Sequence, residues 1–291
     1  MYPLQALDEN AIEAFSPAEK IGLVATVNAE GLPHLTLITS IRAPGPKQIT
    51  LGEFSKGKSK ENLQQNPRAA FLVMTMDRRM WRGHARWTHL RIEGPEYQAY
   101  NELPMFRYNA YLGISRVHYL DLIDARGAEG LPLPTIILSV LMTRLVRRRA
   151  AAKNAKERIL TPFAQGLFNR LDALKFIAWI KPDGFPEIVP VLQCQAAGSR
   201  RLVFSTPAYR KELARIPPDR TVAVFGLTLQ MEDVLVRGTF NGYRRLRGVT
   251  AGTVDIEWVY NSMPPAHGQI YPPVPLDPVT EWRDFGQNPV R

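Results

Sequence analysis

The sequence contains an internal repeat, and this repeat limits the possible folds more than any other feature does. The first copy spans residues 20–75 and the second spans residues 175–226. Three pairs of landmarks share one separation of 153 residues: Gly31 and Gly184, Leu51 and Phe204, Lys58 and Lys211. A constant separation over three landmarks indicates a duplicated structural unit.

Each copy has the same order of predicted elements. Two β-rich runs flank a turn, a third strand follows, and a basic turn leads into a short helix and a fourth strand. Many short strands with frequent turn signals favour barrels over a parallel sheet. We therefore predict a mainly β protein with flanking helices, α+β in class, in which two barrels lie side by side and cover each other's open edges.

The chain length also agrees with two domains. We predict an N-terminal barrel over residues 1–130, a helical linker over 131–173 and a C-terminal barrel over 174–291. The proline-rich end of the chain, from Pro264, is expected to be an extended arm.

The repeat continues less clearly beyond the fourth strand. The segment LRIEG at residues 90–94 is predicted to correspond to VLVRG at residues 234–238. Residues 76–89 have no clear counterpart in the second copy, so we expect an insertion or an extended hairpin there. His84 and His89 in this segment are poor metal ligands because only Arg and Trp surround them, and a surface hairpin is the alternative interpretation.

The segment 136–149 is apolar at first and then basic, ending in Arg147-Arg148-Arg149. The run is shorter than the roughly 20 residues that a membrane span requires. Two interpretations stay open: a buried linker helix with a solvated basic end, or a basic helix that makes weak contact with an anionic membrane surface.

Composition bounds the functional classes. The net charge of +10 suits nucleic acid, a membrane surface or phosphorylated small molecules. No nucleic-acid-binding motif is present, so no nucleic-acid partner is expected. The single cysteine, Cys194, excludes an internal disulfide framework. The N-terminus carries acids and no apolar core, so we expect an intracellular, cytoplasmic protein.

The basic turn after the third strand is the best candidate site. Hydroxyls, cations and the amides of a helix N-terminus together suit a phosphate dianion. A solvated basic turn is the alternative, but its presence in both copies favours function. The candidate residues are Lys56, Lys58, Ser59 and Lys60 in copy one, and Ser205, Thr206, Arg210 and Lys211 in copy two.

Other chemistry is hard to find in the sequence. No nucleophilic triad, dinucleotide fingerprint or metal motif is visible, so catalytic residues stay unknown and any reaction would depend on a bound cofactor. One aromatic group could line the pocket of a flat ring, or it could form core between the barrels. It consists of Tyr97, Tyr100, Phe106, Tyr108 and Tyr111.

The first copy resembles the pyridoxamine 5′-phosphate oxidase-like family of FMN-binding split barrels. The resemblance rests on Asn28–Pro33, Lys58, Asn62-Leu63, Asn66-Pro67-Arg68 and Ile92-Glu93-Gly94. A weaker second match rests on Gly184, Pro186, Thr206, Arg210-Lys211 and Arg237-Gly238. The family's second-strand Arg and Lys are replaced by Thr36 and Ile41.

The resemblance implies two tandem split β-barrels that form a pseudo-dimer within one chain, with FMN between them and its phosphate at a basic turn. It implies an FMN-dependent oxidoreductase that acts on an unidentified small molecule. Haem or deazaflavin binding, or a protein with no cofactor and no catalysis, are the alternatives. The chain is then a monomer, or it forms a homodimer of pseudo-dimers.

Overall fold

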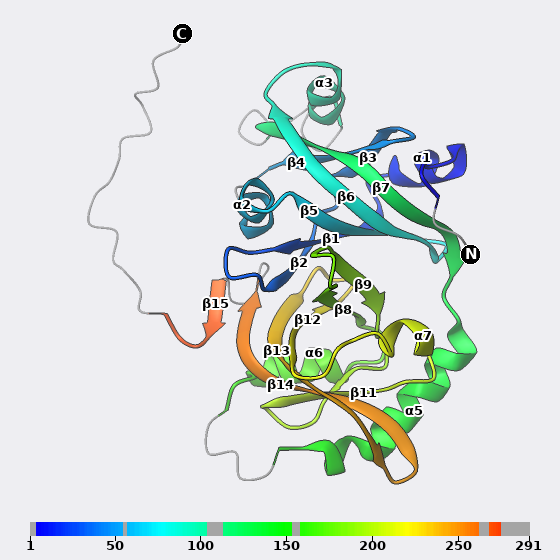
Figure 1. The fold of residues 1–291 in the computed structure, drawn as a ribbon, viewed down its shortest axis with the longest axis vertical. Helices are drawn as coiled ribbons and strands as arrows, with labels where there is room; N and C mark the ends of the chain where they lie inside the picture. The colour runs from blue at the N-terminus through cyan, green and yellow to red at the C-terminus, as the bar shows by residue number, and fades with distance from the viewer. Residues whose placement is uncertain (1–3, 55–56, 104–112, 153–157, 262–267, 275–291) are drawn as a thin grey trace.

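The structure is a computed structural model that describes residues 4–54, 57–103, 113–152, 158–261 and 268–274 (Figure 1). Its first sheet consists of β1 (Lys20–Val27), β2 (Pro33–Leu37), β3 (Ile41–Gly45), β4 (Gln48–Glu53), β5 (Arg68–Thr75), β6 (Arg79–Arg91) and β7 (Arg116–Gly130). Its second sheet consists of β8 (Leu174–Ile180), β9 (Pro186–Pro190), β10 (Gln195–Ala196), β11 (Arg201–Ser205), β12 (Arg220–Leu227), β13 (Asp233–Leu246), β14 (Val249–Asn261) and β15 (Gly268–Tyr271). The helices are α1 (Glu9–Phe15), α2 (Lys58–Gln65), α3 (Pro95–Asn101), α5 (Leu133–Ala150), α6 (Pro162–Asn169) and α7 (Arg210–Leu213).

The two sheets have the same topology. The first follows the order β2-β1-β5-β6-β7-β4-β3, and the second, taken from its other end, follows β9-β8-β12-β13-β14-β11-β10, with β15 added to β14. Each strand of the first sheet therefore has one counterpart in the second. Figure 1 shows the two barrels stacked one above the other. The predicted fold class, two tandem split barrels in one chain, is confirmed.

One part of the predicted repeat is wrong. Residues 76–89 are not an insertion, because they comprise a turn and most of β6, which is the counterpart of β13. Strand β6 pairs antiparallel with β5, so the extended-hairpin alternative is the correct one. The strand registers pair Ala69 with Ala85 and Val222 with Gly238, so the counterpart of Arg237-Gly238 is His84-Ala85, not a residue pair within LRIEG. Each of the two strands also has a glycine that packs against backbone, Gly83 in β6 and Gly238 in β13. At both glycines the neighbouring backbone is too close for a side chain: an added Cβ would lie 2.1 Å from the Asp124 carbonyl oxygen at Gly83, and 1.9 Å from the Asp255 carbonyl oxygen at Gly238.

Three apolar clusters hold the fold together. One fills each barrel, and a third lies between the barrels with side chains from both. Strand β1 contributes to two of them, because Val24 faces its own barrel whereas Leu23 and Ala25 face the cluster between the barrels. A strand that is buried on both faces needs apolar residues at successive positions. This explains the weak alternation of the β1 sequence.

The seam between the barrels is reciprocal. Strand β2 of the first barrel lies against β12 of the second, and its counterpart β9 lies against β5. Reciprocal contacts of this kind are those of an isologous two-fold dimer. The chain therefore forms within one polypeptide an interface of the kind that two identical subunits form.

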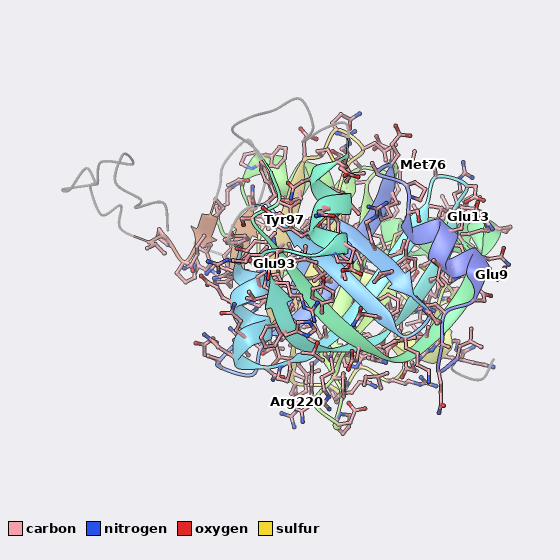
Figure 2. All side chains as sticks on the ribbon, turned by 90° about the horizontal axis from the view of Figure 1, so that it is seen from above. Glu9, Glu13, Met76, Glu93, Tyr97 and Arg220 are labelled. Carbon is pink, nitrogen blue, oxygen red and sulfur yellow. The ribbon has the colours of Figure 1, made fainter. Side chains whose placement is uncertain are left out.

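The helices lie at the periphery of the barrels. Helix α1 is capped at its N-terminus by Asp8, whose Oδ1 accepts the Ala11 N–H at 2.8 Å. Its residues Ala14 and Phe15 are buried, while Glu9 and Glu13 project outward (Figure 2). No helix in the described part of the chain is both long and apolar enough to cross a membrane.

The domain boundaries proposed above stay a prediction. Strand β7 ends at Gly130, helices α5 and α6 occupy the segment 131–173, and β8 begins at Leu174. The expected arm from Pro264 lies mostly outside the described residues, which resume only at 268–274.

Candidate functional site

A cavity of about 450 Å³ opens at the seam beside the first basic turn. Its walls come from β2, β4 and α2 of the first barrel and from β12, β13 and β14 of the second. Cofactor and ligand pockets commonly have volumes of about 300–1,000 Å³ and mostly apolar walls. The leucines of β2 and Phe225 and Leu235 of the second barrel supply that apolar lining here.

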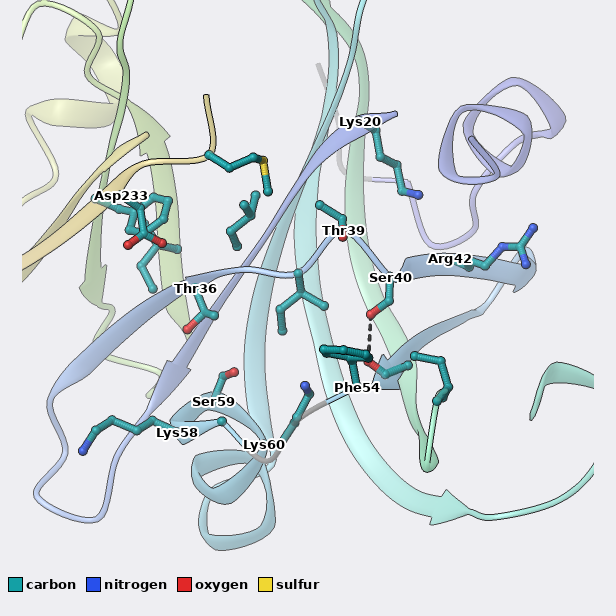
Figure 3. Close-up of a pocket in the computed structure, with 18 of the residues that line it drawn as sticks. Lys20, Thr36, Thr39, Ser40, Arg42, Phe54, Lys58, Ser59, Lys60 and Asp233 are labelled. Atoms are coloured by element: carbon teal, nitrogen blue, oxygen red, sulfur yellow. Dashed lines mark hydrogen bonds between the residues drawn. The ribbon is translucent and has the colours of Figure 1, made fainter. Parts of the chain in front are cut away.

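One end of the cavity is polar and cationic. Lys58, Ser59 and Lys60 form the first turn of α2, and Thr36 of β2 faces them across the cavity (Figure 3). The Thr36 Oγ1 atom is buried and has no hydrogen-bond partner among the described residues. A buried hydroxyl without a hydrogen-bond partner lowers stability, so this atom is a candidate contact for a ligand.

The local backbone supports the same use. Helix α2 begins after Gly57, which has no side chain to cap the first amides. Such amides and the helix dipole favour an anion at this point. Ser59 is 2% exposed and Lys60 is 9% exposed. Burial lowers the pKa of Lys60, and the nearby Glu53 carboxylate opposes this shift.

Aromatic side chains of the second barrel flank this end. The rings of Trp258 and Tyr260 stack at 5.4 Å with parallel planes, and His34 of β2 meets both edge-on. The Lys58 Nζ lies 5.6 Å from the centre of the Tyr260 ring, and the Arg237 guanidinium lies 3.9 Å from that of Trp258. Burial lowers the pKa of His34 to about 3, and Arg237 and Lys58 add to the shift, so the imidazole is neutral at pH 7.

The other end of the cavity carries a second pair of cations. Lys20 is 6% exposed and donates to the Pro17 carbonyl oxygen, and Arg42 lies over the Tyr100 ring at 5.6 Å. Burial, followed by the Arg42 charge, lowers the pKa of Lys20 to about 8. The Tyr100 hydroxyl donates to the Ser40 carbonyl oxygen at 2.6 Å, which ties α3 to the β2–β3 connection.

The second basic turn has different surroundings. Ser205 is fully buried, and its backbone N–H donates to the Thr143 Oγ1 of α5 at 2.9 Å. The Ser205 hydroxyl donates to the Ser139 carbonyl oxygen at 2.8 Å, and the Ala208 N–H donates to the Ser139 Oγ at 2.9 Å. Helix α5 thus satisfies the polar groups of this turn.

Ion pairs occupy the seam beside this second turn. Arg82 of β6 pairs with Glu129 and, at 3.6 Å, with Glu212 of α7. His84 lies 2.8 Å from Asp124 and 3.4 Å from Glu187, and these carboxylates outweigh burial and raise its pKa. His84 is 4% exposed, so the surface-hairpin interpretation of this residue is wrong. The described residues hold no group of three or more His, Cys, Asp or Glu arranged to bind a metal ion.

The sequence-predicted site residues thus fall into two groups. Lys58, Ser59 and Lys60 lie on the cavity, while Lys56 lies outside the described residues. Ser205 is buried under α5, Thr206 is half-buried, and Arg210 and Lys211 are exposed. None of these four candidates from copy two lines the cavity.

Several cavity residues lacked a signal in the sequence. His34, Lys20 and Arg42 sit on or beside β-strands with no recognisable motif, and Asp233 comes from the other barrel. Of the aromatic group, Tyr100 is buried and lines the cavity, and Tyr97 packs against the cluster around it. Phe106, Tyr108 and Tyr111 lie outside the described residues.

The fold is that of a tandem split-barrel protein with a cavity between its barrels. The family model described as pyridoxamine 5′-phosphate oxidase matches residues 8–108. Over this segment, 101 of the 291 residues, the chain is similar to that family. No curated protein matches the chain.

Solved structures resemble the chain over less than half of its length. An FMN-binding protein from Syntrophomonas wolfei is 14% identical over 42% of this chain and 86% of its own, with a TM-score of 0.37. A Lactobacillus delbrueckii protein assigned as a pyridoxamine 5′-phosphate oxidase is 18% identical over 44% of this chain and 100% of its own, with a TM-score of 0.35. An F420 reductase is 17% identical over 40% and 94%, with a TM-score of 0.32.

Proposed function

We propose that the protein binds a phosphorylated flavin, FMN in the first instance, in the seam cavity and acts as an oxidoreductase on a small molecule. The observation on which this proposal rests is the buried Thr36 Oγ1, which has no hydrogen-bond partner among the described residues. It faces Lys58 and Ser59 at one end of a cavity between two split barrels. The family match over residues 8–108 supports a cofactor of the flavin class.

The residues fit the two parts of such a cofactor. Thr36, Ser59 and the two lysines of the turn would hold the phosphate, because hydroxyls and cations are its preferred partners. The apolar middle of the cavity, with Phe225 and Leu235, would take the flat ring system. A flavin bound there supplies hydride and electron transfer, for which the side chains of the described residues have no equivalent.

The two seams also support one cofactor per chain. The first turn opens onto a cavity, whereas α5 hydroxyls satisfy the second turn and ion pairs occupy the seam beside it. Removing those contacts to admit a phosphate would leave the Ser205 and Ala208 amides dependent on the ligand. We therefore expect a stoichiometry of one.

The first test is the spectrum of the purified protein and mass spectrometry of any released cofactor. We expect flavin absorbance, or binding of added FMN that raises the melting temperature. At a ligand concentration of 100 times Kd, binding adds about 2.7 kcal/mol of stability. A haem Soret band, or a colourless protein that FMN does not stabilise, would contradict the proposal. Release of a deazaflavin would support the proposed site but identify a different cofactor.

A matched pair of variants tests the phosphate assignment. Lys58→Met should weaken FMN binding by about 10- to 150-fold, because a charge-assisted hydrogen bond contributes about 1.5–3 kcal/mol. Its binding of riboflavin, which has no phosphate, should change little. Lys211→Met makes the same change in the exposed second turn and should leave FMN binding unaltered. The opposite pattern would move the phosphate to copy two.

A further inference from the structure

Helix α5 presents many of its bulky apolar side chains to solvent, on the face away from the second barrel that it packs against. Its inward residues are small or polar in large part: Ser139, Thr143 and Ala150 are buried with Ile136 and Val146. Ser139 and Thr143 are bonded to the Ser205–Ala208 turn, as described above. These bonds fix the rotation of the helix about its axis.

The outward face of α5 is apolar. Ile137 is 61% exposed and Leu141 is 59% exposed, and Leu138 and Leu145 beside them are about half exposed. Positions 137, 141 and 145 are four residues apart, so their side chains form one stripe along the helix. Single exposed apolar residues are ordinary, but a contiguous stripe marks an interaction surface.

Positive charge surrounds the end of this stripe. Arg144, Arg148 and Arg149 are exposed on the last turns of α5. Leu246 and Val249 of the β13–β14 hairpin pack in one cluster with Val146 and Ala150, so the hairpin tip lies beside the helix end (Figure 1). The tip adds three more exposed arginines: Arg244, Arg245 and Arg247. No acidic residue occurs anywhere in α5.

We propose that the outward face of α5 and the β13–β14 hairpin tip dock on an anionic membrane surface. The leucines would enter the boundary between headgroups and acyl chains, and the arginines would contact lipid phosphates. A helix of 18 residues is about 27 Å long and lies flat in this arrangement. This agrees with the finding that no described helix could span a membrane.

Charge makes a second copy of the chain a poorer occupant of this face. Two α5 helices packed antiparallel would place each arginine-rich end against the N-terminal half of the other. That half carries no carboxylate and has the positive end of the helix dipole. Anionic lipid headgroups offer the arginines the partners that a second α5 lacks.

Co-sedimentation of the full chain with vesicles tests the proposal. We expect binding to phosphatidylcholine vesicles that contain about a third phosphatidylserine, and little binding to phosphatidylcholine alone. Each arginine near an anionic surface contributes about a factor of five to binding. The triple variant Arg144→Gln, Arg148→Gln, Arg149→Gln should therefore bind on the order of a hundredfold more weakly.

A control triple variant separates location from net charge. Arg78→Gln, Arg116→Gln and Arg220→Gln remove the same charge from exposed positions elsewhere, of which Arg220 is labelled in Figure 2. This control should bind within about twofold of the unaltered protein. Equal loss in both triple variants would overturn the proposal, as would equal binding to neutral vesicles or no binding at all.

The apolar stripe needs its own pair of variants. Ile137→Ser with Leu141→Ser should reduce vesicle binding by at least tenfold, while Leu171→Ser with Leu229→Ser, at exposed sites elsewhere, should not. Circular dichroism and the melting temperature establish that each variant is folded. If the unaltered protein is a dimer that the stripe variant dissociates, and neither binds vesicles, the occupant is a second copy and the proposal fails.

Discussion

Replacing Thr36 by valine should change stability and ligand binding in opposite directions. The two side chains have nearly the same shape, so the substitution removes a hydroxyl and little else. The Thr36 Oγ1 is buried with no hydrogen-bond partner among the described residues. A buried hydroxyl without a partner costs about 1–3 kcal/mol. Without ligand, Thr36→Val should therefore raise the free energy of unfolding by about 1 kcal/mol.

The same hydroxyl gains a partner when a phosphate occupies the site. A hydrogen bond to a charged group contributes about 1.5–3 kcal/mol, so the valine variant should bind FMN about 10- to 150-fold more weakly. Riboflavin should bind both proteins alike. Thermal unfolding with and without ligand, combined with calorimetric titration, measures both effects on one protein sample.

A control on the neighbouring strand makes this test specific. Thr26 is also buried, but its hydroxyl accepts a hydrogen bond from the Asn62 side-chain amide at 2.9 Å. Thr26→Val should therefore destabilise the protein by about 1–3 kcal/mol. If Thr36→Val also destabilises the ligand-free protein, or leaves FMN affinity unchanged, the hydroxyl is no phosphate ligand and the reasoning fails.

Three further outcomes follow from single contacts. The pKa of His34 is about 3 in the folded protein and 6.5 in the unfolded chain. Between these values the unfolded state binds more protons, so the free energy of unfolding falls as the pH falls from 6.5 towards 3. His34→Leu should remove about 2 kcal/mol of this loss between pH 6.5 and about 4.5, as measured by urea titrations. Thr143→Val should lower the free energy of unfolding by about 1–3 kcal/mol, because the Ser205 N–H loses its acceptor, without weakening FMN binding in titrations. Gly83→Ala should cost about 3 kcal/mol through a clash with backbone, whereas Gly130→Ala, with open space around it, should be near neutral in denaturation curves.

The repeat predicted the fold because barrel topology is encoded locally. Strand, turn and short-helix signals recur in the same order in both copies, and the sheets have matching strand orders. The predicted correspondence between the two copies was wrong at β6, because the sequence LRIEG resembles VLVRG. The strand registers instead make Ala85 the counterpart of Gly238, again 153 residues apart. The contacts that fix this register join neighbouring strands, and no short window of sequence contains them.

The candidate site was predictable only in part. The turn at Lys58–Lys60 was found because cations and hydroxyls at the start of a helix have a recognisable spacing. The equivalent turn at Ser205 has similar chemistry in sequence, but its partners in α5 are 62–69 residues away along the chain. His34 and Lys20 gain their perturbed pKa values only from burial in the assembled seam.

Fusion of two copies explains how the seams came to differ. In a dimer of identical subunits, any substitution appears at both seams, so a residue that closes one ligand site closes the other. In a tandem chain each seam changes independently. Here Trp258 and Tyr260 form an aromatic wall beside one turn, while ion pairs around Arg82 and His84 occupy the other seam. One seam can therefore serve as a ligand site while the other holds the barrels together.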